Sequence, residues 1–188
     1  MRSSSPLAAW HPVQPEPPRE DFGAAYLAPY WISPRSRPDG SWSLSERPGR
    51  PTLHATGNSL DRPGHTLPGH TFVGRRQQHP DCRVPARLDL GTGRCALSVR
   101  MEEAHHYDLE VAGGEVRVIA RIGPVPQELA RRPLPSGPVT LLVECRTARS
   151  ATATGPDAIT FAIEGGDPLA ELAAATPPPR SPPTSPAV

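Results

Sequence analysis

The chain has 188 residues, enough for one domain of ordinary size, and a formal net charge of +1 from 20 basic and 19 acidic residues. This balance provides no global electrostatic field for nucleic acid or an anionic membrane surface, and we expect neither as a partner. All 20 basic residues are arginine, and alanine, glycine and proline are abundant, so we attribute the arginine content to coding composition rather than to phosphate binding.

Cysteine usage and the lack of long apolar runs favour a cytoplasmic protein. Cys82, Cys95 and Cys145 are far apart and form no paired zinc motif, so we predict free thiols packed as small hydrophobic residues. No apolar run reaches the length of a membrane span, and the first 18 residues lack the apolar core of a signal peptide. We therefore expect a cytoplasmic location and no metal or cofactor.

Proline is concentrated at both ends of the chain. Residues 1–20 and 173–188 are proline-rich and carry no regular apolar spacing, so we predict that both ends are disordered. Residues 21–172 alternate strand-like runs with Gly/Pro turns and predict one all-β module. Its first part, WSLSERPGRPTLHATGNSL, reads as a strand, a Pro-Gly turn and a second strand.

Two hairpins and two further strands follow. CRVPARLDLGTGRCALSVRM predicts a hairpin around GTG, and HHYDLEVAGGEVRVIARIG predicts another around Ala-Gly-Gly. QELARR is the one helix-like piece and is too short to matter, while GPVTLLVECR and DAITFAIEGG add two strands. Short local connections predict an antiparallel two-sheet β-sandwich, with the strands forming a meander.

Charged side chains share the second face of these strands. Their signs interleave, and cross-strand pairs of this kind contribute roughly 0.2–1 kcal/mol each, so we interpret the set as a solvated sheet face. A ligand-binding concave face is the alternative. The set comprises Arg83, Arg87, Asp89, Arg100, His106, Asp108, Glu110, Arg117 and Arg121, and the orientation of Glu144 and Arg146 stays open.

The stretch MEEAHHYDLEV, residues 101–111, is compatible with a metal site, an acid/base pair or a strand. On a strand, His105 and His106 point to opposite faces and do not readily bind one metal ion. Glu102 and Glu103 fall at a turn or strand end, where carboxylates are solvated rather than buried as acid/base catalysis requires. Without GxSxG, HExxH or a phosphate loop in the sequence, we predict a strand and no catalytic residue.

VGRRQQH, residues 73–79, followed by ARLDLG and LSVRMEEAHHYDLEVAGGEVRVIARIG, resembles the C-terminal β-sandwich module of glycoside hydrolase family 43 β-xylosidases and arabinofuranosidases. The resemblance covers residues 21–172 and implies a concanavalin A-like jelly roll. In such enzymes a separate five-bladed propeller, N-terminal to the module, supplies the catalytic carboxylates. The resemblance therefore implies no catalytic residue and no enzyme activity in this chain alone. It also implies packing against the propeller, with candidate contacts at Arg75, Arg76, Gln77, Gln78 and His79.

The end of the chain departs from the family pattern. AAATPPPRSPPTSPAV follows where a glycine-bearing closing segment is expected, and we interpret the chain as a gene fragment or a frameshifted product. The leading hypothesis is a non-catalytic accessory module that supports a propeller. A stand-alone carbohydrate-binding module for xylan or arabinan oligosaccharides is the alternative, although aromatic residues make up only 5% of the chain. A hydrolase in its own right would require a carboxylate pair that the sequence does not reveal.

Overall fold

The chain divides into two compact units in the computed structural model. The smaller unit comprises Met1–His54 and Thr71–Arg75, and the larger comprises Ala55–His70 and Arg76–Val188. The structure describes residues 16–33, 40–56, 60, 71–89, 93–134, 137–147, 149–150, 153–154 and 158–173. Most of the two ends predicted to be disordered, residues 1–15 and 174–188, lies outside the described residues. Within the described part, no helix is long and apolar enough to cross a membrane.

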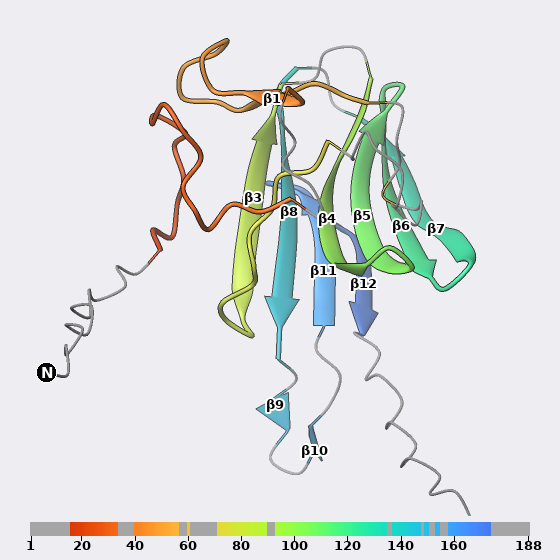
Figure 1. Ribbon diagram of the computed structural model, residues 1–188. Coiled ribbons are helices and arrows are strands. Elements are labelled where there is room, and N and C mark those ends of the chain that lie inside the picture. Colours follow the sequence, from red (N-terminus) through yellow and green to blue (C-terminus); the bar gives the residue numbers. More distant parts are fainter. Residues whose placement is uncertain are drawn as a thin grey trace, which may run out of the picture. The chain divides into compact units, whose positions relative to one another are not determined.

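The larger unit is built on two four-stranded antiparallel sheets, as Figure 1 shows, which confirms the predicted all-β sandwich. The first sheet has the order β12-β11-β8-β3 and the second has the order β4-β5-β6-β7. The strands of the first sheet are β3 (Cys82–Leu88), β8 (Val139–Arg146), β11 (Ala158–Ile163) and β12 (Pro168–Ala173). Those of the second are β4 (Arg94–Glu102), β5 (His105–Ala112), β6 (Glu115–Ile122) and β7 (Val125–Pro133). A short pair, β9 (Arg149–Ser150) and β10 (Ala153–Thr154), follows β8.

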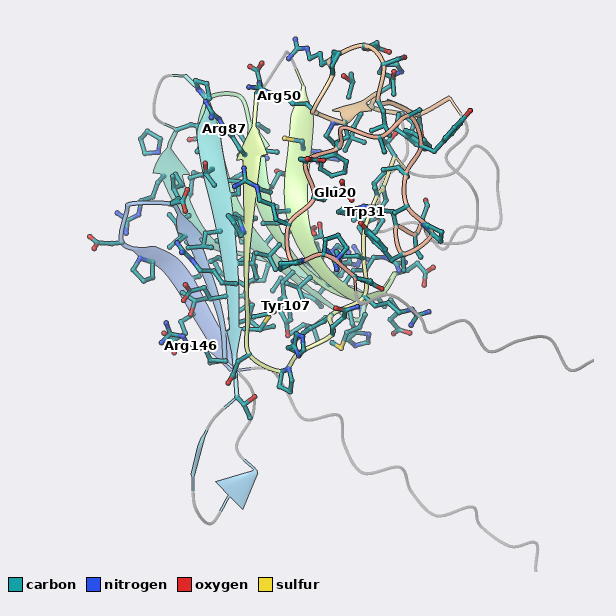
Figure 2. The ribbon with its side chains drawn as sticks, turned by 90° about the vertical axis from the view of Figure 1, so that its left-hand side faces the viewer. Glu20, Trp31, Arg50, Arg87, Tyr107 and Arg146 are labelled. Carbon is teal, nitrogen blue, oxygen red and sulfur yellow. The ribbon has the colours of Figure 1, made fainter. Side chains whose placement is uncertain are left out.

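The core lies between the two sheets, because every second side chain of each central strand points inward. Tyr107 from the second sheet and Phe161 from the first meet there, with ring centroids 6.4 Å apart. Figure 2 labels Tyr107 in this layer. The buried cluster comprises Tyr107, Leu109, Val111, Val116, Val118, Ala120, Val139, Leu141, Val143, Cys145, Ile159 and Phe161.

The hairpin predicted around Ala-Gly-Gly is confirmed. β5 pairs with β6 in antiparallel register, with Ala112 opposite Glu115. Gly113 and Gly114 between them have φ values of 59° and 78°. Two consecutive left-handed residues make the tight turn that matches the twist of a hairpin, and glycine adopts this conformation without a Cβ clash.

The hairpin predicted around GTG is wrong. β3 pairs with β8 in the first sheet, whereas β4 pairs with β5 in the second, so the chain crosses from one sheet to the other between them. The physical reason is that alternation fixes which side chains face the core but not which strand is the neighbour. Two alternating strands satisfy the same pattern side by side or facing each other across a sandwich.

The helix-like interpretation of QELARR is also wrong, because these residues form most of β7. This strand pairs with β6, and the register shifts where Val118 and Ile119 face Ala130 and Glu128. Gln, Glu, Ala and Arg favour helices by only a few tenths of a kcal/mol each. Backbone pairing with a neighbouring strand outweighs that preference.

In the described part of the smaller unit, the regular structure is one short strand pair and an isolated bridge. β1 (Trp42–Ser43) pairs with β2 (Thr52–Leu53), which confirms the predicted strand, turn and strand. An isolated bridge joins Ile32 to Gly74 through backbone hydrogen bonds of 2.7 and 2.9 Å. Residues 71–75 therefore belong to this unit although they are distant in sequence.

Candidate interaction sites

Ion pairs cover part of the outer face of the second sheet. Glu110 on β5 is opposite Arg117 on β6, and the guanidinium of Arg117 donates a short hydrogen bond to Glu110 Oε1. Arg94 Nε lies 3.4 Å from Glu110 Oε2, and the Glu110 side chain is only 9% exposed. Towards the edge strand, Arg131 lies 2.8 Å from Glu128 and 3.0 Å from Glu115. The carboxylates are thus held as partners of guanidinium groups.

A row of basic side chains crosses the same face at His106, four residues before Glu110 on β5. Arg100, His106 and Arg121 are direct neighbours on β4, β5 and β6. Acidic side chains lie beside this row. His106 Nδ1 lies 2.9 Å from Asp108 Oδ2, and Arg100 Nη2 lies 3.2 Å from Glu103 Oε1.

The interpretation of this face as solvated is wrong for two of its members. His106 is 2% exposed and Glu110 is 7% exposed as whole residues. Asp108 is anchored as well, because its Oδ1 accepts a 2.6 Å hydrogen bond from Ser98 Oγ. Alternation assigns these residues to the outer face correctly, but it does not report how closely their neighbours pack around them.

The two adjacent histidines are separated by the strand, as predicted. The His105 side chain is 41% exposed and its Nδ1 lies 2.6 Å from Glu102 Oε1. His106 is buried on the other face of β5, beside Asp108. Within the residues that the structure describes, no group of three or more His, Cys, Asp and Glu side chains is arranged to hold a metal ion.

Of the remaining charges predicted on that face, Arg83 and Arg87 lie on β3 of the other sheet, and Asp89 follows the end of that strand. Arg83 Nε lies 3.2 Å from Glu144 Oε1, and Arg83 Nη2 lies 3.4 Å from Glu164 Oε1. Arg146 also pairs with Glu144, at 3.0 Å. These contacts place Glu144 and Arg146 on the outer face of the first sheet, and Figure 2 labels Arg146 and Arg87 towards opposite ends of this sheet.

The five candidate interdomain residues do not form one group. Arg75 belongs to the smaller unit, where Nη2 lies 2.8 Å from Glu16 Oε2 and Nη1 donates to the Pro17 carbonyl at 3.1 Å. Its guanidinium also lies 5.0 Å from the ring centroid of Tyr30. Arg75 is therefore engaged by residues of its own chain. The other four candidates, Arg76, Gln77, Gln78 and His79, belong to the larger unit and are exposed.

Gln77 is the one of these four with a described side-chain contact to its own segment. Its Nε2 donates to the carbonyls of His79 at 2.8 Å and Pro80 at 3.2 Å, which fixes the local turn. Arg76, Gln78 and His79 present their side chains outward. Their role in domain contact stays a prediction.

A carboxylate surrounded by aromatic residues in the smaller unit escaped the sequence analysis. Glu20 Oε2 accepts hydrogen bonds from the Tyr30 hydroxyl at 2.7 Å and from Trp31 Nε1 at 3.2 Å; Figure 2 shows Glu20 and Trp31 together. The Tyr30 hydrogen bond lowers the pKa of Glu20 and raises the pKa of Tyr30. Glu20 Oε1 accepts the Phe22 amide at 3.0 Å and supports its unusual φ of 53°. In the sequence, the adjacent Tyr30 and Trp31 are the one sign of this cluster, and they do not identify Glu20 as the acid that they contact.

Exposed apolar side chains gather at one end of the second sheet. Met101, Ile122 and Val125 are between 56% and 68% exposed. Ile122 and Val125 are opposite each other at the β6–β7 turn, and Met101 is the second-to-last residue of β4, beside the β4–β5 turn. Large apolar side chains that stay exposed together favour an interaction surface. We call these three residues the apolar rim.

The sheets and their charged faces define an all-β domain of the concanavalin A-like kind. Residues 19–165 match the family described as the beta-xylosidase C-terminal concanavalin A-like domain, and the chain belongs to this family. The match confirms the resemblance inferred from the RRQQH and HHY runs.

Known relatives are longer than this chain. The non-reducing end alpha-L-arabinofuranosidase BoGH43B of Bacteroides ovatus is 28% identical over 116 residues, which are 60% of this chain and 21% of that protein. The structure of the Bacteroides ovatus xyloglucan PUL GH43B protein superposes with a TM-score of 0.68 at 22% identity, over 89% of this chain and 33% of that one. The GH43 BlXynB protein from Bacillus licheniformis gives 0.61 at 20% identity, over 79% and 28%. This chain therefore spans between a fifth and a third of the length of these relatives.

Proposed function

We propose that this chain is a non-catalytic accessory sandwich that supports the catalytic domain of a family 43 glycoside hydrolase acting on pentosides. The observation that carries the proposal is the location of the match, which is confined to a C-terminal domain family and to 21–33% of longer relatives. The name of the arabinofuranosidase relative and the β-xylosidase family description supply the substrate class. The partner that we propose is a five-bladed propeller, and the location that we propose is cytoplasmic.

The chemistry of the described acids supports an accessory role. Glycoside hydrolysis uses two carboxyl groups that face each other about 5–10 Å apart, one of them protonated. Here Glu110 contacts Arg117, Glu128 contacts Arg131, and Asp108 contacts Ser98 and His106. The hydrogen bond from Arg131 lowers the pKa of Glu128 and so favours its ionised form, which is the wrong state for a proton donor.

The direct test combines this chain with a separately produced family 43 catalytic domain. We expect calorimetry to detect association, and we expect the chain alone to give no release of nitrophenol from nitrophenyl arabinofuranoside or xyloside. Nitrophenol release that is proportional to the amount of purified chain and is blocked by a glycosidase inhibitor would refute the accessory role. Absence of association with catalytic domains from both the arabinofuranosidase and xylosidase groups would refute the proposed partner.

Two surfaces are available for this contact, the segment at residues 76–79 and the apolar rim, and single substitutions distinguish them. We expect Arg76→Ala or Val125→Asp to weaken association about tenfold, the effect of roughly 1.4 kcal/mol typical of a contributing interface residue. Both side chains are exposed, so the melting temperature should stay unchanged. Arg146→Ala is the matched control, because Arg146 is exposed on the outer face of the other sheet. Equal affinity of all three variants would discard both surfaces.

Oligosaccharide binding is a second candidate function, favoured by the ring cluster of the smaller unit. Phe22 and Trp31 lie with centroids 5.3 Å apart and stay partly exposed, beside the polar groups of Glu20 and Arg75. Aromatic faces with a few fixed polar groups are the usual elements of a sugar site. If xylo- or arabino-oligosaccharides bind there, tryptophan emission should shift in the wild type and in Trp42→Phe but not in Trp31→Phe. A flat titration in the wild type would remove this candidate.

A further inference from the structure

Two of the three cysteines are directly opposite each other on neighbouring strands. Cys82, the first residue of β3, is the register partner of Cys145 near the end of β8. Opposed residues of an antiparallel pair have Cα atoms about 4.5–5.5 Å apart. A disulfide requires Cα atoms about 4.4–6.8 Å apart, so the backbone already meets its first condition.

Both side chains point to the same side of the first sheet. Cys145 belongs to the buried core cluster and Cys82 packs against it, so their Cβ atoms leave the sheet in the same direction. Residues that flank Cys82 and Cys145 in the sequence make contacts that hold β3 and β8 in this register. Asp81 Oδ1 accepts a 2.6 Å hydrogen bond from the Thr147 amide, and Arg83 lies 3.2 Å from Glu144.

Access and reactivity also differ among the three thiols. Cys82 is partly exposed whereas Cys145 is buried, so an oxidant in solution reaches Cys82 first. Cys95 lies in the other sheet, opposite Val111. Burial raises the pKa of the Cys95 thiol, which keeps it protonated and weakly nucleophilic.

We propose that Cys82 and Cys145 form a reversible cross-strand disulfide when the protein meets a disulfide oxidant such as oxidised glutathione. The Cys82 thiolate attacks a sulfur of the oxidant and releases one glutathione thiolate. Cys145 then loses its proton and attacks Cys82 Sγ, which forms the protein Sγ–Sγ bond and releases the second glutathione. The two protein thiols lose two electrons, the oxidant is reduced to two thiols, and the two protons pass to the leaving thiolates.

Among the described strands of this sheet, the bond would tie the edge strand β3 to its neighbour β8. β3 ends the order β12-β11-β8-β3, and the whole second sheet lies in the chain between Cys82 and Cys145. Cross-linking across so long a loop restricts the unfolded chain strongly. In a reducing cytoplasm the pair stays as thiols, and in an oxidising compartment it closes.

The test incubates the full chain with oxidised glutathione under native conditions and counts thiols after denaturation. We expect the count to fall from three to one, a non-reducing digest to link the Cys82 peptide to the Cys145 peptide, and the melting temperature to rise by several degrees until a reductant is added. Cys95→Ser should still lose its two thiols, whereas Cys82→Ser should keep both.

Three outcomes would overturn the proposal. One is a count that stays at three, another is a stable glutathione adduct on Cys82, and the last is a linkage that includes Cys95 or a second chain. Cys82→Ser is the informative loss variant because Cys82 is partly exposed and its replacement leaves the core intact. None of these outcomes bears on whether the chain supports a catalytic domain.

Discussion

Replacing Phe161 by alanine is expected to lower the free energy of unfolding by roughly 3–5 kcal/mol, the largest loss that we expect from truncating one described core side chain. Phe161 is 0% exposed and lies in β11, a central strand of the first sheet. Its ring meets Tyr107 of the second sheet, so alanine would leave a cavity between the sheets rather than within one of them. A domain is typically stable by only about 5–15 kcal/mol, and a large fraction of that would be lost.

Urea unfolding of the wild type, Phe161→Ala and Phe161→Leu measures this effect. The leucine variant keeps most of the volume and should lose less than half as much stability as the alanine variant. Thr160→Ala is the control, because Thr160 is the adjacent residue of β11 and points away from the core. A loss below about 1 kcal/mol for Phe161→Ala would mean that the two sheets do not pack through this ring.

The sequence predicted the sheet faces well, and the reason is visible in β5 and β6. Tyr107, Leu109 and Val111 alternate with polar residues up to Gly113 and Gly114, and the return strand continues the same alternation. A period of two fixes which side chains face the core, and two glycines fix where the strand turns. The elements and the fold class follow from these local rules.

Partners distant in sequence could not be predicted in this way. β3 obeys the same alternation as β4 but pairs with β8, and the register that opposes Cys82 to Cys145 depends on that choice. The contact between Arg75 and Glu16 joins residues 59 positions apart and has no periodic signal. The burial of Glu110 also depends on side chains of neighbouring strands. From the sequence alone, a charged residue on an outer face is predicted to be solvated. Local pattern determines orientation, whereas tertiary pairing determines neighbours.

Removing the Glu110 carboxylate is expected to destabilise the second sheet by about 2–4 kcal/mol, because Glu110→Ala would leave the half-buried guanidinium of Arg117 without its nearest acid. The loss should fall below that of a fully buried pair, since Arg117 is 25% exposed and regains some hydration. Glu110→Gln should lie between alanine and the wild type, because an amide oxygen still accepts a hydrogen bond but carries no charge.

The exposed ion pairs of Arg131 provide a comparison in which opposite charges are paired but not buried. Arg131→Ala breaks two contacts with acids, at Glu115 and Glu128, yet its half-exposed setting predicts a loss of no more than about 1 kcal/mol. Glu110→Leu combined with Arg117→Leu should recover most of the stability lost in Glu110→Ala, because the buried acid and its half-buried partner are then removed together, and Arg94, the other partner of Glu110, is 62% exposed and regains hydration. These unfolding free energies decide whether the cost arises from the unpaired charge. If the double variant were less stable than Glu110→Ala, the ion pair itself would be stabilising the sheet. If Glu110→Ala cost no more than Arg131→Ala, the outer face would be solvated as its charge pattern suggests.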